Sequence, residues 1–169
     1  MASEHIYKQY DADLQSIRAK VLEMGTIVEE QLSEAVQSLI EADTKLAEKV
    51  IRRDEEVNNL EIDIDEDCSL LIGKRSPVAA DLRNVLMMIK IISDLERIGD
   101  ESTKIANATI RIIENGIMSK PQFKNIQSML SSVQLMLRQA LNSFARLTLP
   151  KPLRSWKKTR KWMKNTVHI

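Results

Sequence analysis

Residues 93–106 read SDLERIGDESTKIA, and the rest of the chain is organised around this stretch. Glu96 and Asp100 lie four residues apart within a helical hydrophobic pattern, so one turn of helix places both carboxylates on the same face. Gly99 lies between them, and glycine is costly inside a helix unless another element packs close to its backbone. The stretch therefore predicts a helix with an acidic pair on one face and a close contact at Gly99.

Apolar residues recur at helical spacing on both sides of this stretch, which predicts helices over about residues 7–42, 45–72, 77–113 and 123–147. The break between the first two is Asp43-Thr44, and Ser76-Pro77 is the expected N-cap and first position of the third helix. The apolar residues expected on the buried side of that helix are Val85, Leu86, Ile89, Ile92, Leu95, Ile98 and Ile105. Three long helices with short connections predict an all-α, antiparallel three-helix bundle. The fourth helix either returns alongside it or begins a second unit.

Composition and charge limit the class of protein. The 169 residues suffice for one sizeable domain, and the single cysteine, Cys68, excludes an internal disulfide and favours a reducing compartment. The N-terminal residues lack the apolar core of a signal peptide, and no apolar run approaches the roughly 18 residues of a membrane span. The net charge of +1 conceals a division: residues 148–169 contain seven basic and no acidic residues, whereas residues 1–147 contain 18 basic and 24 acidic ones, a net charge of −6.

A second group of polar residues lies on the second predicted helix. Asp54, Asn58, Glu61 and Asp65 follow i, i+4, i+7, i+11 spacing and form one stripe. In an antiparallel bundle this stripe can face Glu96 and Asp100, which would gather oxygen ligands suited to Mg, Ca, Mn or Fe. Spacing alone equally fits an ordinary solvated face.

The distribution of histidines argues against catalysis. The only two, His5 and His168, lie near the ends of the chain, so the Glu-x-x-His pairs of di-iron enzymes and the histidine of a nucleophilic triad are missing. No glycine-rich phosphate-binding loop is present either. The expected function is binding, and we predict that the protein is not an enzyme.

The first and fourth predicted helices resemble each other at a fixed offset of about 105 residues. The aligned identities are Met24/Met129, Val28/Val133, Leu32/Leu137, Ala35/Ala140 and Ser38/Ser143. Residues 148–169 differ in composition from the rest of the chain, since they contain both tryptophans and two of the four prolines. Read one base earlier, codons for these residues permit a sequence similar to residues 43–64, so we hypothesise a frameshift near Leu147. The alternative is a genuine basic amphipathic tail that lies on acidic lipid or nucleic acid.

SDLERIGDESTKIA resembles the signature of the PhoU family of bacterial regulators of phosphate uptake. The segments HIYKQYDADLQSIRAKVLEMG, DEEVNNLEIDIDEDC and KRSPVAADLRNVLMMIKIISDLERIGD resemble the same family, so the likeness extends over residues 5–147. It implies a cytoplasmic, commonly homodimeric regulator built from two three-helix repeats. Such a protein represses the phosphate-starvation response through contacts with the phosphate ABC transporter and a membrane sensor histidine kinase, with no role in binding nucleic acid. It reaches the membrane only through these partners.

The resemblance also implies a metal site. Some family members bind iron or other metal clusters through acidic E(D)xxxD motifs, which correspond here to Glu96 and Asp100 on the third helix and to Glu61 and Asp65 on the second. The expected ligands are these four carboxylates, and the expected metal is Fe, Mn, Zn or Mg.

Compared with the family pattern, the sequence divides into three parts. Residues 5–115 correspond to the first three-helix repeat, 121–147 to the first helix of an incomplete second repeat, and 148–169 to the basic tail. This division predicts an exposed apolar face on the fourth helix. It also leaves two further functional interpretations: a metal-binding bundle for sensing or storage, and a non-functional truncated paralogue whose tail lies on a membrane surface.

Overall fold

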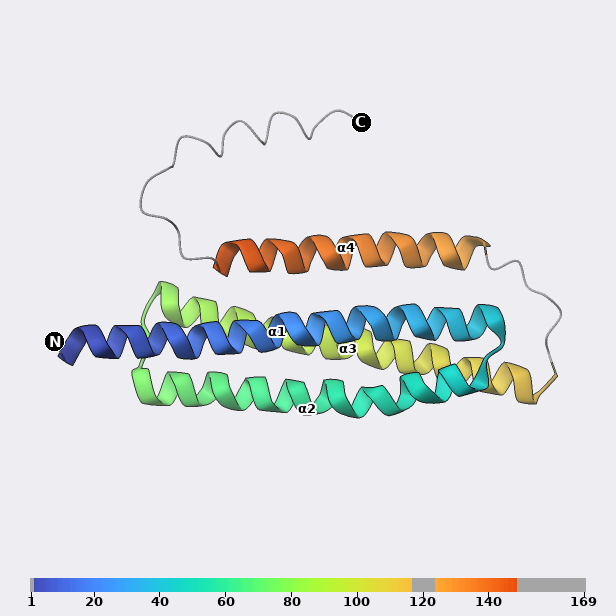
Figure 1. Cartoon of the computed structure of the whole chain (residues 1–169), viewed down its shortest axis with the longest axis horizontal. Coiled ribbons are helices and arrows are strands. Elements are labelled where there is room, and N and C mark those ends of the chain that lie inside the picture. Colours follow the sequence, from blue (N-terminus) through green and yellow to red (C-terminus); the bar gives the residue numbers. More distant parts are fainter. Residues whose placement is uncertain (1, 117–123, 149–169) are drawn as a thin grey trace, which may run out of the picture.

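The computed structural model of the chain describes residues 2–116 and 124–148, and all regular structure within these ranges is α-helical. The four helices are α1 (Ala2–Glu41), α2 (Thr44–Arg75), α3 (Ala80–Glu114) and α4 (Lys124–Thr148). Helices α1, α2 and α3 run up, down and up to form an antiparallel bundle, and α4 lies along the outer side of α1 (Figure 1). The expected all-α architecture is confirmed.

The bundle has an apolar core because each of its helices carries an apolar stripe at helical spacing. This core consists of a main cluster and a smaller one formed by Ala35, Ala47, Val50 and Ala106. The most deeply buried members of this core are Val21, Met24 and Val28 of α1, Val57, Ile64 and Cys68 of α2, and Val85, Met88 and Ile92 of α3. Leu86, which the pattern assigned to the buried side of α3, is instead 52% exposed, because it follows Val85 and lies outside the narrow stripe that faces the core. Cys68 is core packing, and its burial raises the pKa of its thiol to about 11.

The connection between α2 and α3 differs from the sequence-based expectation. Ser76 is the C-cap of α2 rather than the N-cap of α3: it adopts a left-handed conformation with φ +45°, and its N–H donates to Ile72 O at 2.9 Å. Helix α3 then begins at Ala80, three residues later than expected, after Pro77 has interrupted the helical hydrogen-bonding pattern. The start of α2 is conventional, since the side chain of Asp43 caps it.

Helix α4 is antiparallel to α1 (Figure 1) and, of the described helices, only α1 lies within close backbone distance of it. Leu137 and Phe144 are buried in this contact, and Leu141 lies directly over Gly25 of α1, which leaves no room for a β-carbon at that position. An ion pair between Arg138 and Glu29 joins the two helices. The packing of α4 is therefore one-sided.

Two sequence-based interpretations fall wholly or largely outside the described residues. These are the frameshift origin of residues 148–169 and the alternative of a membrane-surface tail, since the description ends at Thr148. Within the described helices, none is long and apolar enough to cross a membrane.

Candidate functional site

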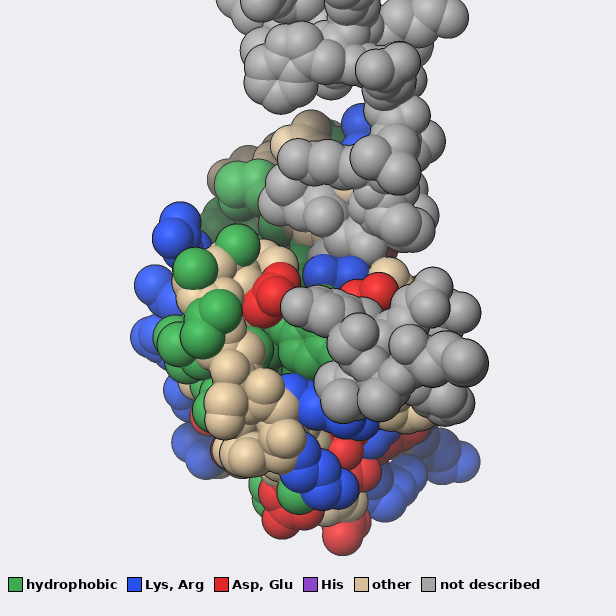
Figure 2. Space-filling view, turned by 90° about the vertical axis from the view of Figure 1, so that its left-hand side faces the viewer, with side chains coloured by type: hydrophobic (Ala, Val, Ile, Leu, Met, Phe, Trp, Pro, Cys, Tyr) green, Lys and Arg blue, Asp and Glu red, His purple; other side chains and the backbone are tan. Residues whose placement is uncertain are grey.

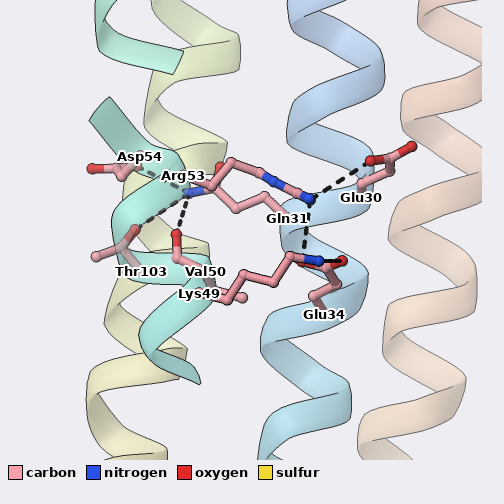
Figure 3. Close-up of polar contacts among 8 residues, drawn as sticks. All are labelled: Glu30, Gln31, Glu34, Lys49, Val50, Arg53, Asp54 and Thr103. Atoms are coloured by element: carbon pink, nitrogen blue, oxygen red, sulfur yellow. Dashed lines mark hydrogen bonds and ion pairs between the residues drawn. The ribbon is translucent and has the colours of Figure 1, made fainter. Parts of the chain in front are cut away.

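A buried glutamine at the centre of the bundle ties its three helices together (Figure 3). Gln31 of α1 is fully buried. Its Nε2, which carries two hydrogens, lies within hydrogen-bonding distance of three acceptors: Asp54 Oδ1 at 3.1 Å and Val50 O at 3.4 Å on α2, and Thr103 Oγ1 of α3 at 3.4 Å. Its Oε1 is buried without a hydrogen-bond partner among the described residues. A buried polar group of this kind is stabilising only when its partners are in place, so it fixes the relative positions of the helices.

Gly99 allows α3 to approach this glutamine. A β-carbon at Gly99 would lie 3.2 Å from Gln31 Oε1, 3.4 Å from Asp54 Oδ1 and 3.4 Å from Val57 Cγ1. These contacts come from α1 and α2 together, so the backbone of α3 touches both neighbours at the same point. The prediction of a close contact at Gly99 is confirmed, and it explains why a glycine is found between Glu96 and Asp100.

Next to this contact, acidic residues of α2 and α3 face each other. Burial raises the pKa of the Glu61 carboxyl, and the charges of Asp65 and Asp100 raise it further. Burial also raises the pKa of the Glu96 carboxyl, as do the charges of Asp100, Glu61 and Asp54, while the charge of Arg97 partly offsets this shift. Glu61 and Glu96 thus each lie within the electrostatic field of an acid on the other helix. We call Glu61, Asp65, Glu96 and Asp100 the acidic face.

The acidic face forms no ion pair in the part of the chain that the structure describes, although the charge of Arg97 partly offsets the raised pKa of Glu96. Its four carboxylates form no ion pair with a lysine or arginine there, whereas three ion-paired sites join α1 to α2 elsewhere. At one of them Arg53 approaches Glu34 at 3.1 Å and Glu30 at 3.6 Å (Figure 3). Lys49, Arg53 and Arg75 of α2 are thus paired with acids of α1, and the carboxylates between α2 and α3 are left without an ion pair.

Uncompensated carboxylates are suitable oxygen donors for a hard cation, and a bound cation would relieve their mutual repulsion. Within residues 2–116 and 124–148, however, no three Asp, Glu, His or Cys side chains are gathered closely enough to hold an ion together. Metal binding by the four predicted ligands stays a prediction.

The sequence analysis missed Gln31 and Thr103. A signal for the glutamine was present: it lies in the apolar stripe of α1, seven residues after Met24 and four before Ala35, where a polar side chain must be buried. Asp54 was identified as part of the α2 stripe, but its role as the acceptor for Gln31 depends on a third helix and is not visible in the spacing.

The family model and the most similar known proteins point to the same family. The PhoU domain model matches residues 21–109, from the middle of α1 through most of α3. The chain is 40% identical over 144 residues to the phosphate-specific transport system accessory protein PhoU homolog of Pseudomonas aeruginosa, covering 85% of this chain and 59% of that protein. It is 37% identical over 159 residues to the accessory protein PhoU of Escherichia coli K12, covering 94% of this chain and 65% of the relative. The chain thus spans roughly three fifths of these relatives' lengths.

Solved structures show the same likeness. The crystal structure of PhoU from Pseudomonas aeruginosa matches with a TM-score of 0.77 at 40% identity, over 81% of this chain and 65% of that one. The phosphate transport system regulatory protein PhoU from Streptococcus pneumoniae matches with a TM-score of 0.72 at 29% identity, over 80% of this chain and 63% of that one. The matched family domain, these relatives and the helical fold agree, and the chain belongs to the PhoU domain family.

Proposed function

We propose that the chain is an accessory protein of a phosphate-specific transport system, which modulates phosphate uptake and represses the phosphate-starvation response. The observation that carries this proposal is the 40% identity, over 85% of the chain, to a relative of that name. The mechanism is protein–protein contact with the phosphate ABC transporter and its membrane sensor histidine kinase, without catalysis. The protein acts in the cytoplasm as a homodimer, binds no nucleic acid, and reaches the membrane through these partners.

The acidic face is the best candidate for the contact surface. Its carboxylates form no ion pair among the described residues, so a complementary basic surface on a partner would gain ion pairs without breaking existing ones. It lies on α2 and α3, and neither of these helices is in close backbone contact with α4.

A membrane-binding assay tests this proposal. We expect the purified chain to be retained by membranes that contain the transporter and the kinase, and not by membranes that lack both. The variant Glu96→Gln/Asp100→Asn, which keeps side-chain shape and removes charge, should bind more weakly. Glu101→Gln is the matched control, because Glu101 is exposed and already paired with Lys104. Equal retention by both kinds of membrane would contradict the proposal.

Complementation measures how much of the regulatory role this chain performs. In a strain that lacks its own PhoU protein, we expect weak or no restoration of repression at high phosphate, because the chain spans only 56–65% of the length of its relatives. Full restoration would show that the 169 residues of this chain suffice for repression.

Metal sensing or storage is the second candidate function, supported by the facing carboxylates of Glu61, Glu96 and Asp100. Elemental analysis of the purified protein for Fe, Mn, Zn and Mg, followed by calorimetric titration with Mg²⁺ and Mn²⁺, tests it. We expect binding that Glu96→Gln/Asp100→Asn weakens at least tenfold. Absence of all four metals and no heat of binding would exclude this function.

A membrane-surface role for residues 148–169 is a third possibility, which rests on their seven basic and no acidic residues. Sedimentation with anionic liposomes, before and after deletion of residues 149–169, measures it directly. Equal sedimentation of the two forms would exclude this role.

A further inference from the structure

A pocket between α1 and α2 lies near the end of the bundle at which α2 ends. Its volume is about 170 Å³, which is the share of about five or six molecules in liquid water. Apolar residues form part of its lining, and the polar residues that line it are Asp13, Ser16, Asp67, Lys74 and Arg75. Figure 2 looks onto this end of the bundle and shows basic and acidic side chains next to one another in its lower half. The pocket is on the α1 side of α2, whereas the acidic face is on the α3 side.

The two acidic residues of the pocket are already engaged. Asp13 Oδ1 accepts a hydrogen bond from Gln9 Nε2 at 2.9 Å, and Asp13 Oδ2 lies 3.4 Å from Arg75 Nη2. Asp67 Oδ2 accepts from Lys20 Nζ at 2.7 Å. Among the described residues, Asp67 Oδ1 is therefore the one carboxylate oxygen of the pocket that is left without a partner.

The basic residues and the serine, by contrast, have unused donors. The 3.4 Å contact of Arg75 with Asp13 is longer than the charge-assisted bonds of about 2.7–2.9 Å that such groups commonly form. Within the described residues this guanidinium forms no other hydrogen bond, and its Nε is buried without an acceptor. Within the same ranges Lys74 forms no ion pair, and the Ser16 hydroxyl forms no hydrogen bond.

This balance of donors and acceptors selects an anion. Three groups offer unused donors from both helices, while a single carboxylate oxygen is left to hold an amine or a metal ion. Counted with Lys20, three basic and two acidic residues give the site a net charge of +1, in a stretch, residues 1–147, whose net charge is −6. The volume is smaller than the range of about 300–1,000 Å³ typical of pockets for larger organic ligands, so the anion is small.

Lys74 and Arg75 also lie in the last turn of α2, where basic side chains offset the negative end of the helix dipole. That role does not require a pocket. Arg111 lies in the last turn of α3, is exposed and does not line the pocket. It is therefore the control that separates a specific site from general compensation of charge at a helix end.

We propose that this pocket binds a small tetrahedral oxyanion of the phosphate class, either the free ion or the end group of a phosphate monoester. The guanidinium of Arg75 donates to two of its oxygens, in the bidentate arrangement common between arginine and phosphate. The ammonium of Lys74 adds a second positive charge from α2, and the hydroxyl of Ser16 donates from α1. The bound anion joins the two helices at this end of the bundle. The inference does not rest on the proposed transport role, because the purified chain alone binds the anion.

Nuclear magnetic resonance of the purified full chain tests the site directly. The Nε–H signals of the arginine side chains are followed while inorganic phosphate replaces chloride at constant ionic strength. We expect the Arg75 signal to shift and saturate, with half-saturation at about 1 mM or below, while the Arg111 signal stays in place. A second titration with glycerol phosphate distinguishes the source of the anion. Tighter binding than phosphate identifies a monoester, weaker binding identifies the free ion, and both outcomes support the site.

Calorimetric titration of three variants with phosphate locates the binding. Arg75→Lys keeps the charge but loses the planar fork of donors, so we expect binding to weaken at least about tenfold. Lys74→Gln should weaken binding about threefold or more, whereas Arg111→Gln, which removes the same charge from the last turn of α3, should leave it unchanged. Lys74 is exposed, so Lys74→Gln carries the test if circular dichroism shows that Arg75→Lys is unfolded.

Three results would overturn the inference. The first is the absence of saturation by either anion up to about 10 mM. The second is an equal loss of binding in Lys74→Gln and Arg111→Gln, since general positive charge would then account for it. The third is unchanged binding in both Arg75→Lys and Lys74→Gln, because phosphate would then bind elsewhere on the chain.

Discussion

Helices α1 and α4 carry the same apolar pattern in two different environments. In α1 the stripe through Met24 and Val28 is fully buried by the α2–α3 pair, while in α4 the corresponding Met129 and Val133 are 67% and 38% exposed. Helix α4 is held on one side only, through Leu137, Phe144 and its ion pair from Arg138. The comparison shows that a periodic stripe specifies which face of a helix needs cover, and that the partner elements decide whether the face contributes to stability.

The largest expected change in stability comes from a pair of equivalent substitutions, one in each helix. Met24→Ala removes a fully buried side chain from the core and should destabilise the protein by about 2–5 kcal/mol. Met129→Ala, at the corresponding position in α4, should change stability by no more than about 0.5 kcal/mol, because its side chain is 67% exposed. Urea denaturation of the two variants measures both values. Similar losses would mean that the stripe of α4 is buried in solution.

The next test exchanges the one position at which the two stripes differ in chemistry. Gln31 of α1 corresponds to Met136 of α4. Gln31→Met keeps the volume but removes the donor that Asp54 and Thr103 share, so we expect a loss of about 1–3 kcal/mol. The reverse change, Met136→Gln, should be nearly neutral, because its side chain is 61% exposed. Thermal denaturation compares the two, and a neutral Gln31→Met would show that this hydrogen-bonding group does not stabilise the bundle.

A third test uses two helical glycines of the α2–α3 pair, the element that covers α1 and has no counterpart on α4. Gly99→Ala places a β-carbon 3.2 Å from Gln31 Oε1 and should destabilise by about 1 kcal/mol, since the crowding exceeds the gain in helix propensity. At Gly73 no atom lies within 4 Å of the place that a β-carbon would take, so Gly73→Ala should stabilise by up to about 1 kcal/mol. Guanidinium denaturation distinguishes these signs, and stabilisation by both would contradict the close packing at Gly99.

The smallest expected change in stability concerns the acidic face, which lies on the same helix pair. The pKa of Glu61 in the folded protein is raised above its ordinary value of 4.5. Ionisation of the Glu61 carboxyl is therefore less favourable in the folded than in the unfolded state. The protonated carboxyl contributes stability that is fully present below pH 4.5 and is lost as the pH rises through the raised pKa.

Glu61→Gln removes this ionisation. In the absence of divalent cations, we expect the variant to be more stable than the parent at pH 7, by about 0.5 kcal/mol or less, and to lose this advantage at pH 4. Urea denaturation at the two pH values measures the difference. A variant that is less stable than the parent at pH 7 would indicate that the carboxylate makes a favourable contact.

Local patterns predicted most of the helices, because apolar periodicity reports directly on which residues face a core. They also predicted the close contact at Gly99, since a glycine in a helix interior needs such a reason. They failed at Ser76, which was expected to be the N-cap of α3 but is the C-cap of α2. A serine followed by a proline fits either position, so the local sequence does not distinguish them. They failed at Gln31 too, whose three acceptors come from α2 and α3 and are brought together only by the tertiary fold. Spacing marked the four carboxylates, but their proximity across two helices required the structure.

Hydrogen exchange tests the central claim most directly, because it compares α1 and α4 within one molecule. The amides of residues 24–38 and 129–143 are monitored by mass spectrometry under native conditions. We expect the α4 segment to exchange at least tenfold faster, since it opens without disrupting the α1–α3 core, while the α1 segment exchanges only when that core unfolds. Equal protection of the two segments would contradict the account, because it would mean that α4 is covered as completely as α1.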